Sequence, residues 1–133
     1  MAKDKAELEP KKFVVWANPH DDFRYASIYV QDSSGRSFII PLFNGVKYRQ
    51  VYGVPRKLWD PRNPEKPLFE AYSIEGEFDA EHIRWKTAKM KVKDLITLEE
   101  RFIDVEDWPF SLYEGDELYQ GDKKVLSSRP PSD

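Results

Sequence analysis

A run of aromatic and basic residues in the middle of the chain has the composition of a nucleic-acid-binding surface. Single-stranded nucleic acid binds where cations follow its phosphates and flat rings stack on its bases. The segment KYRQVYGVPRKLWDPR supplies both, and we predict binding by Lys47, Tyr48, Arg49, Tyr52, Arg56, Lys57, Trp59 and Arg62. The alternative is that Tyr48 and Tyr52 share a core-facing side with Val46, since buried aromatic rings usually mean packing.

A second segment, residues 103–119, interleaves carboxylates with aromatic rings and suits docking into a basic, apolar groove of a partner. Its piece DVEDWPF resembles the acidic C-terminal tip of bacterial single-stranded-DNA-binding proteins, although 23 residues follow Phe110 here. An acidic, aromatic surface can also mimic nucleic acid. The alternative function is therefore protein binding or inhibition by Asp104, Glu106, Asp107, Trp108, Phe110 and Tyr113. A packed surface loop with Trp108 and Phe110 in the core explains the same pattern.

Other clusters favour no specific chemistry. A histidine beside two carboxylates at residues 18–22 has ligand types, but metal sites usually need three or more converging protein ligands, and the other histidine is His82. A turn rich in Asn, Pro and Asp is the ordinary explanation. Cysteine is absent, and no phosphate-cradling or nucleophile motif occurs. We expect no metal and no cofactor, and these residues favour a binding protein over an enzyme.

Length and composition indicate one small domain. The chain has 133 residues, of which 40% are hydrophobic and 14% aromatic. We expect a flexible arm over 1–10, a globular domain over 11–126 with an acidic segment at 99–122, and a flexible tail over 127–133. No apolar run has the length of a membrane span, and no leader pattern is present. We therefore predict a cytoplasmic protein without a membrane partner, and the oligomeric state stays open.

Charge is unevenly distributed along the chain. The net charge is −3, yet residues 1–98 carry 17 basic and 14 acidic side chains, and residues 99–133 carry 4 basic and 10 acidic ones. The basic part suits a polyanion and the acidic part suits a basic partner. Two solvated faces that keep the protein soluble explain the blocks equally well.

The hydrophobic pattern predicts an α+β fold with a curled antiparallel sheet or small β-barrel of about five strands. Residues 25–31 and 37–43 form the clearest hairpin, and Asn44-Gly45 predicts a tight turn into a strand over 46–54. Four prolines predict a stiff loop over 55–67. Residues 80–96 fit a packed helix, with a bulged strand as the alternative. A capping box at 97–100 predicts a further short helix.

Two motifs resemble the KTSC domain family. YGVP at Tyr52–Pro55 and AYSIEGEFDAEHIR at Ala71–Arg84 are similar to that family's Tyr-Gly-Val-Pro strand end and its Ala-x-Ser-x-Gly, Phe-Asn and Ile-Arg motifs. The resemblance covers residues 46–84. The Ser-to-Gly spacing is one residue longer here, Asp79 stands at the usual Asn, and the proline-rich loop is additional. The resemblance implies a small strand-rich module that binds RNA.

The nucleic-acid hypothesis predicts binding to a single-stranded oligonucleotide that weakens as salt rises, because phosphate contacts release counterions. Fluorescence anisotropy titrations at two salt concentrations measure it. Absence of binding at low salt would contradict the hypothesis.

Overall fold

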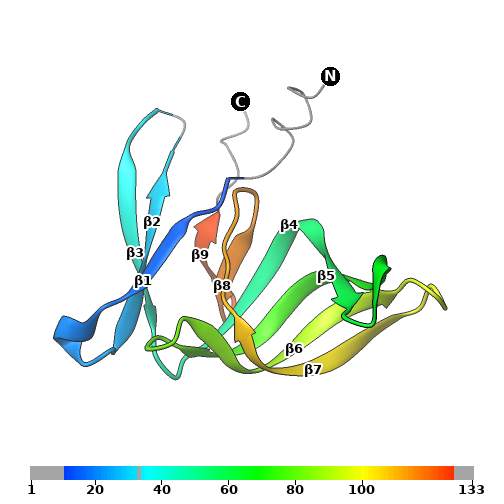
Figure 1. Ribbon diagram of the computed structural model, residues 1–133. Helices are drawn as coiled ribbons and strands as arrows, with labels where there is room; N and C mark the ends of the chain where they lie inside the picture. Colours follow the sequence, from blue (N-terminus) through cyan, green and yellow to red (C-terminus); the bar gives the residue numbers. More distant parts are fainter. Residues whose placement is uncertain (1–10, 33, 128–133) are drawn as a thin grey trace.

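The computed structural model describes residues 11–32 and 34–127, and most of them lie in β-strands. The elements follow one another as shown in Figure 1: β1 (Val14–Ala17), η1 (Pro19–Asp21), β2 (Tyr25–Gln31), β3 (Ser37–Phe43), β4 (Lys47–Asp60), β5 (Asn63–Asp79), β6 (Arg84–Asp94), β7 (Glu100–Pro109), β8 (Glu117–Gln120) and β9 (Lys123–Ser127). The predicted α+β class is wrong, because the only helical element of the described residues is the three-residue η1. The predicted arm and residues 128–133 of the predicted tail lie outside the described residues.

The strands form two antiparallel sheets, and neither closes into the barrel considered above. One sheet has the order β1-β2-β3, and the other has the order β7-β6-β5-β4-β8-β9. Figure 1 shows the smaller sheet upright at the left and the larger sheet curling below it and to the right. The hydrophobic core lies between the sheets, with Ile28 and Leu42 from the smaller sheet and Tyr48, Ile74 and Trp85 from the larger one.

The predicted hairpin over 25–31 and 37–43 is confirmed as β2 and β3. Its turn is held by one carboxylate, because Asp32 Oδ1 accepts hydrogen bonds from the amides of Ser34 and Arg36 at 3.0 and 2.9 Å. Gly35 adopts a φ of +92°, which a residue with a side chain rarely takes. The turn is therefore specified locally, as the sequence indicates.

Asn44-Gly45 makes a tight turn, but β3 and β4 do not pair with each other. The two strands belong to different sheets, so the single curled sheet predicted from the sequence is wrong. The amide of Gly45 donates to the carbonyl of Phe78, and Asn44 Oδ1 accepts from the amide of Ala80. These bonds to the end of β5 direct the chain from one sheet into the other.

The stiff proline-rich loop predicted over 55–67 is instead the distal part of the β4–β5 hairpin. The prolines are tolerated because the pairing is irregular around them. The ladder is interrupted between Val51 and Arg56, where Pro55 lies, and shifts again where Trp59 pairs with Pro67. At those positions the missing amide hydrogen disrupts no regular ladder.

The helix predicted over 80–96 is also wrong, because residues 84–94 form β6. Trp85 and Thr87 pair with consecutive residues of β5, so Lys86 is the extra residue of a β-bulge. The bulge changes the side that alternate residues face, which makes the buried positions resemble a helical stripe. Those buried positions are Trp85, Ala88, Met90 and Val92.

The short helix predicted from the capping box is a turn between β6 and β7. Asp94 Oδ1 accepts hydrogen bonds from the amides of Ile96 and Thr97 at 2.8 and 3.1 Å. Leu98 has a φ of +65°, and β7 begins at Glu100. A polar residue here stabilises the reversal between two strands rather than the start of a helix.

The uneven charges of the sequence become neighbours in the larger sheet. The strand register alternates basic and acidic residues from β4 to β7, and each facing pair among them has opposite signs. The pairs are Lys47–Glu77, Arg49–Glu75, Lys57–Glu70, Glu75–Lys89, Glu70–Lys93, Asp79–Arg84, Lys89–Asp104 and Lys93–Glu100. Opposite charges at facing positions favour this register over its alternatives. We call this set the charge ladder.

Reversing one charge in the ladder should destabilise the sheet. Lys89→Glu would place a carboxylate opposite both Glu75 and Asp104, and we expect a loss of about 1–2 kcal/mol in the free energy of unfolding. Lys66→Glu is the matched control, since Lys66 is exposed and has no register partner among the described strand pairs. Urea denaturation at low and high salt measures both variants. Equal losses at low salt would contradict the ladder.

Candidate binding surfaces

Two of the three rings predicted to stack on bases are buried. Tyr48 is 2% exposed and Tyr52 is 6% exposed, so neither ring is available to a ligand. The Tyr48 hydroxyl accepts the amide of Phe43 at 2.9 Å, and burial raises the pKa of Tyr52 to about 12. The core-packing alternative therefore holds for both tyrosines. Trp59 remains half exposed near the tip of the β4–β5 hairpin.

The cations of the same segment are spread along the β4–β5 hairpin. Lys47 and Arg49 belong to the charge ladder, where Glu77 and Glu75 face them, and the Arg49 guanidinium lies over the ring of Tyr119 at 4.5 Å. Lys57 and Arg62 are exposed further along the hairpin. The structure thus does not assemble the predicted basic–aromatic surface into one site.

Arg56 belongs to a partly buried ion pair. Its Nη2 donates to Asp116 Oδ2 at 2.7 Å and to the carbonyl of Ser111 at 3.1 Å. Its guanidinium lies between the rings of Tyr52 and Tyr113, at 4.1 and 4.7 Å from their centroids. The arrangement satisfies the charge of Arg56 within the chain and leaves it a structural residue.

Asp116 is the acceptor at the centre of this network. It is 2% exposed. Its carboxylate also accepts hydrogen bonds from the amide of Gly53, the amide of Tyr113 and the side-chain amide of Gln50. An added Cβ at Gly53 would lie 2.5 Å from the carbonyl oxygen of Gly115, so only glycine allows this approach. The network joins β4 to the segment before β8.

A groove opens beside this network. Its volume is about 470 Å³, and it is lined by Val54, Pro55, Arg56, Lys57, Trp59, Tyr113 and Asp116. Trp59 and Lys57 are its exposed aromatic and basic side chains, and they are the residues of the predicted basic–aromatic site that are both exposed and in this groove.

The acidic–aromatic segment is divided between the surface and the core. Asp104, Glu106 and Asp107 are exposed on β7, and the charge ladder opposes Asp104 with Lys89. Trp108 is half-buried, and Phe110 is 6% exposed in contact with Trp85, their ring centroids 5.6 Å apart. Tyr113 is half-buried against Arg56. Its carboxylates and rings therefore do not form one docking surface.

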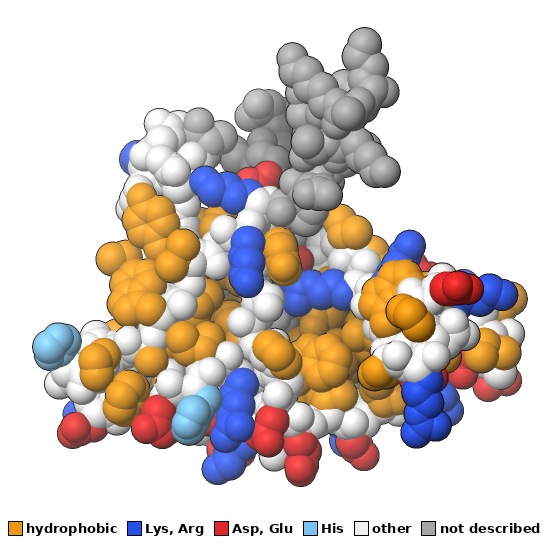
Figure 2. All heavy atoms as spheres, in the orientation of Figure 1, with side chains coloured by type: hydrophobic (Ala, Val, Ile, Leu, Met, Phe, Trp, Pro, Cys, Tyr) orange, Lys and Arg blue, Asp and Glu red, His pale blue; other side chains and the backbone are white. Residues whose placement is uncertain are grey.

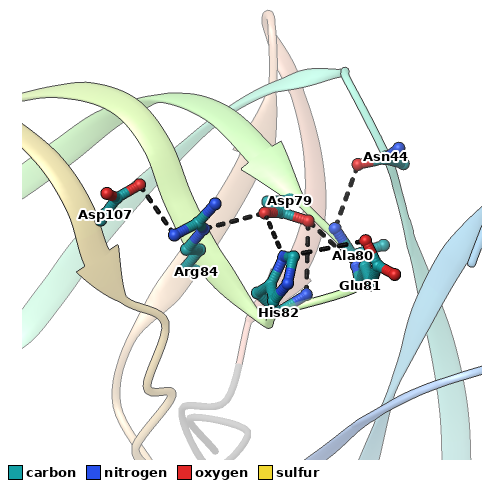
Figure 3. A network of polar contacts seen from close by, with 7 residues as sticks. All are labelled: Asn44, Asp79, Ala80, Glu81, His82, Arg84 and Asp107. Atoms are coloured by element: carbon teal, nitrogen blue, oxygen red, sulfur yellow. Dashed lines mark hydrogen bonds and ion pairs between the residues drawn. The ribbon is translucent and has the colours of Figure 1, made fainter.

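A polar cluster fixes the turn between β5 and β6. Figure 3 shows that Asp79 Oδ2 accepts hydrogen bonds from His82 Nδ1 at 2.9 Å and from Arg84 Nε at 2.8 Å. Arg84 also forms an ion pair with Asp107 at 2.9 Å. Burial opposes ionisation of Asp79, but the hydrogen bonds from His82 and Arg84 outweigh it and lower its pKa. The stabilisation is therefore present above the ordinary carboxyl pKa and is lost as pH falls through the lowered value.

Among residues 11–32 and 34–127, the strands of the smaller sheet place no charged side chain on their outer face. Alternation along the strands, together with the register, places ten residues on it: Val14, Trp16, Tyr25, Ser27, Tyr29, Gln31, Ser37, Ile39, Pro41 and Phe43. Val14 and Ile39 are 61% and 62% exposed, and Trp16, Tyr29 and Phe43 are each more than a third exposed. We call this surface the apolar face. Figure 2 shows hydrophobic side chains gathered over this sheet at the left and mixed charges along the lower edge.

Several polar atoms of the apolar face already have partners within the chain. The Tyr29 hydroxyl and Ser37 Oγ share a hydrogen bond of 2.6 Å, and Asn18 Nδ2 donates to the Tyr25 hydroxyl at 2.7 Å. Gln31 Nε2 reaches the carbonyl of Gly35 at 3.4 Å. If a partner covered the face, few of its polar groups would therefore be left without a hydrogen-bond partner.

The apolar face was not predicted from the sequence, although a signal for it is present. Residues 38–43 read FIIPLF, an unbroken apolar run. A strand with one wet face alternates apolar and polar residues, whereas a strand covered on both faces does not. The run therefore indicates a second covered face, which becomes visible once the pairing partners are known.

Residues 11–32 and 34–127 contain neither a cluster of metal ligands nor a membrane-spanning helix. Within these ranges, no group of three or more His, Asp or Glu side chains could hold a metal ion. His20 lies at the turn η1, where its amide donates to Asn18 Oδ1 at 3.1 Å. No helix in the same ranges has the length and apolarity needed to cross a membrane.

Comparisons with known proteins give no match: no family model, no curated protein and no solved structure is similar to this chain. The resemblance to the KTSC family therefore stays a prediction.

Removing the charge of Asp116 should cost much of the stability of the fold. Asp116→Asn leaves Arg56 partly buried without its counter-charge, and we expect a loss of about 3 kcal/mol in the free energy of unfolding. Asp122→Asn is the control, because Asp122 is exposed in the β8–β9 turn and should change stability by less than about 0.5 kcal/mol. Thermal and urea denaturation compare the two. A loss no larger than that of the control would contradict the role of Asp116.

Proposed function

We propose that this chain is a protein-binding module whose binding surface is the apolar face of the β1–β3 sheet. The observation that carries the proposal is an uncharged, largely hydrophobic sheet surface in a chain in which 34% of residues are charged. Large exposed apolar patches on soluble proteins usually mark interaction sites. The partner surface must itself be apolar and uncharged, because the face offers no counter-charge to a buried ion.

This proposal keeps the protein-binding alternative drawn from the sequence but moves it to another surface. Residues 99–119 were its expected site, and there Phe110 belongs to the core and Asp104 faces a lysine in register. Tyr29, Ile39 and Phe43 instead present accessible rings and methyl groups on one side of a regular sheet. Such side chains provide the apolar centre that protein interfaces need.

Nucleic-acid binding receives less support from the geometry, and it stays a prediction. Stacking would rest on Trp59 alone among the three predicted rings, and Arg56 is engaged by Asp116. The charge ladder places a carboxylate opposite Lys47, Arg49 and Lys57. A phosphate backbone needs a continuous positive track, which these facing carboxylates interrupt.

Site-specific photocrosslinking tests the proposed function. A photoreactive phenylalanine analogue at Ile39, on the apolar face, should give a discrete protein adduct in the cells that make the chain. The same analogue at Ile96 is the matched control, because Ile96 is 78% exposed but lies in the β6–β7 turn. An adduct from position 39 and not from position 96 supports the proposal.

Two results would overturn it. One is the absence of any adduct from position 39 when the protein is folded and abundant. The other is an identical pattern of adducts from both positions, since that pattern reports nonspecific contact. A circular dichroism spectrum of each purified variant verifies that its fold is unchanged.

A further inference from the structure

We infer that the occupant of the apolar face is a second copy of this chain, so that two β1–β3 sheets stack face to face in a symmetric dimer. The inference rests on the proposed function and names the partner. Three features support it: the two-sided apolar character of β3, the absence of charge on the face, and the area that the face offers.

The first feature is the sequence of β3. Ile40 and Leu42 point inward and pack with the core, while Ile39, Pro41 and Phe43 lie on the outer side. A strand that is apolar on both sides suits the middle layer of a three-layer arrangement. The six-stranded sheet is one outer layer, and the matching sheet of a second copy would be the other, about 10 Å away.

The second feature is charge. In a two-fold interface each patch meets its own copy, so any net charge on the patch would repel itself. The chain carries a net charge of −3, and the apolar face avoids this repulsion because none of its side chains ionises at neutral pH. The hydroxyls of Tyr25 and Tyr29 are already hydrogen-bonded within the chain, so the stacked sheets can exclude water without stranding them.

The third feature is area, which sets the expected strength. Five large side chains are 38–62% exposed on the face. Three of the five are aromatic, and a full aromatic side chain presents about 150–250 Å². With the two smaller aliphatic side chains, the five offer at most roughly 500 Å² per copy. Two copies would bury about 1,000 Å², near the lower bound of specific interfaces. The dimer should therefore be weak and depend on concentration.

Sedimentation velocity on the full chain tests the dimer. Over a concentration series from about 10 μM to 1 mM, a range suited to a small interface, the weight-average mass should rise from the 15.7 kDa of one chain toward twice that value. Ile39→Lys should weaken the association at least about tenfold, because each interface would bury two unpaired charges. Val14→Lys is a second variant with the same expectation, on a different strand.

Ile96→Lys is the control, because it adds the same charge at an equally exposed apolar residue away from the face. A wild-type mass that stays at one chain throughout the series would overturn the dimer. So would an association that Ile96→Lys weakens and Ile39→Lys does not.

The photocrosslink separates failure of the dimer from failure of the proposed function. If the chain stays monomeric but position 39 gives an adduct with a different protein, the dimer is wrong and the binding role stands. If the chain stays monomeric and position 39 gives no adduct, both are wrong. An adduct of two copies of this chain, together with the mass increase, supports both.

Discussion

The buried carboxylate of Asp116 is the constraint on which the arrangement of the two sheets depends. It binds Arg56, Gln50 and the amide of Gly53 on β4, and it closes the turn at Tyr113. The segment that it anchors also bonds to the start of the smaller sheet, since the amide of Phe13 donates to Leu112. One charged group thereby links β4, the segment before β8 and β1. The apolar face points outward because the opposite face of the same sheet packs on the core.

Local signals in the sequence predict the parts of the fold that local bonds hold. The β2–β3 hairpin follows from Asp32 and Gly35, whose bonds and dihedral angle lie within the turn itself. β6 was mistaken for a helix because the bulge at Lys86 makes its buried positions repeat irregularly, and only the pairing with β5 shows where the extra residue lies. The prolines of the β4–β5 hairpin predict a loop instead of strands for the same reason. The strands accommodate them only at register shifts, which no local pattern in the sequence shows.

The candidate sites differ in how much of each can be predicted from the sequence. Composition predicts stacking by Tyr48, Tyr52 and Trp59 alike, and of the three only Trp59 is exposed. The sequence does not show that Tyr48 turns inward, because alternation does not say which side of a strand is covered. The basic and acidic parts suggest two separate surfaces, yet antiparallel pairing places Lys89 and Lys93 of the basic part opposite Asp104 and Glu100 of the acidic part. The apolar face consists of side chains from β1, β2 and β3, so it can be recognised only when the register of these three strands is known.

The indole N–H signals of the four tryptophans can show whether the chain associates through the apolar face, because each signal reports a different part of the molecule. Trp16 lies on the apolar face, Trp59 near the hairpin tip, Trp85 in the core and Trp108 in the acidic segment. An NMR dilution series of the full chain, with each signal assigned by a single Trp→Phe variant, follows all four together. We expect the Trp16 signal to shift with concentration while the others stay fixed, because only Trp16 lies on the apolar face. A shift of Trp59 or Trp108 with Trp16 unchanged would contradict this expectation.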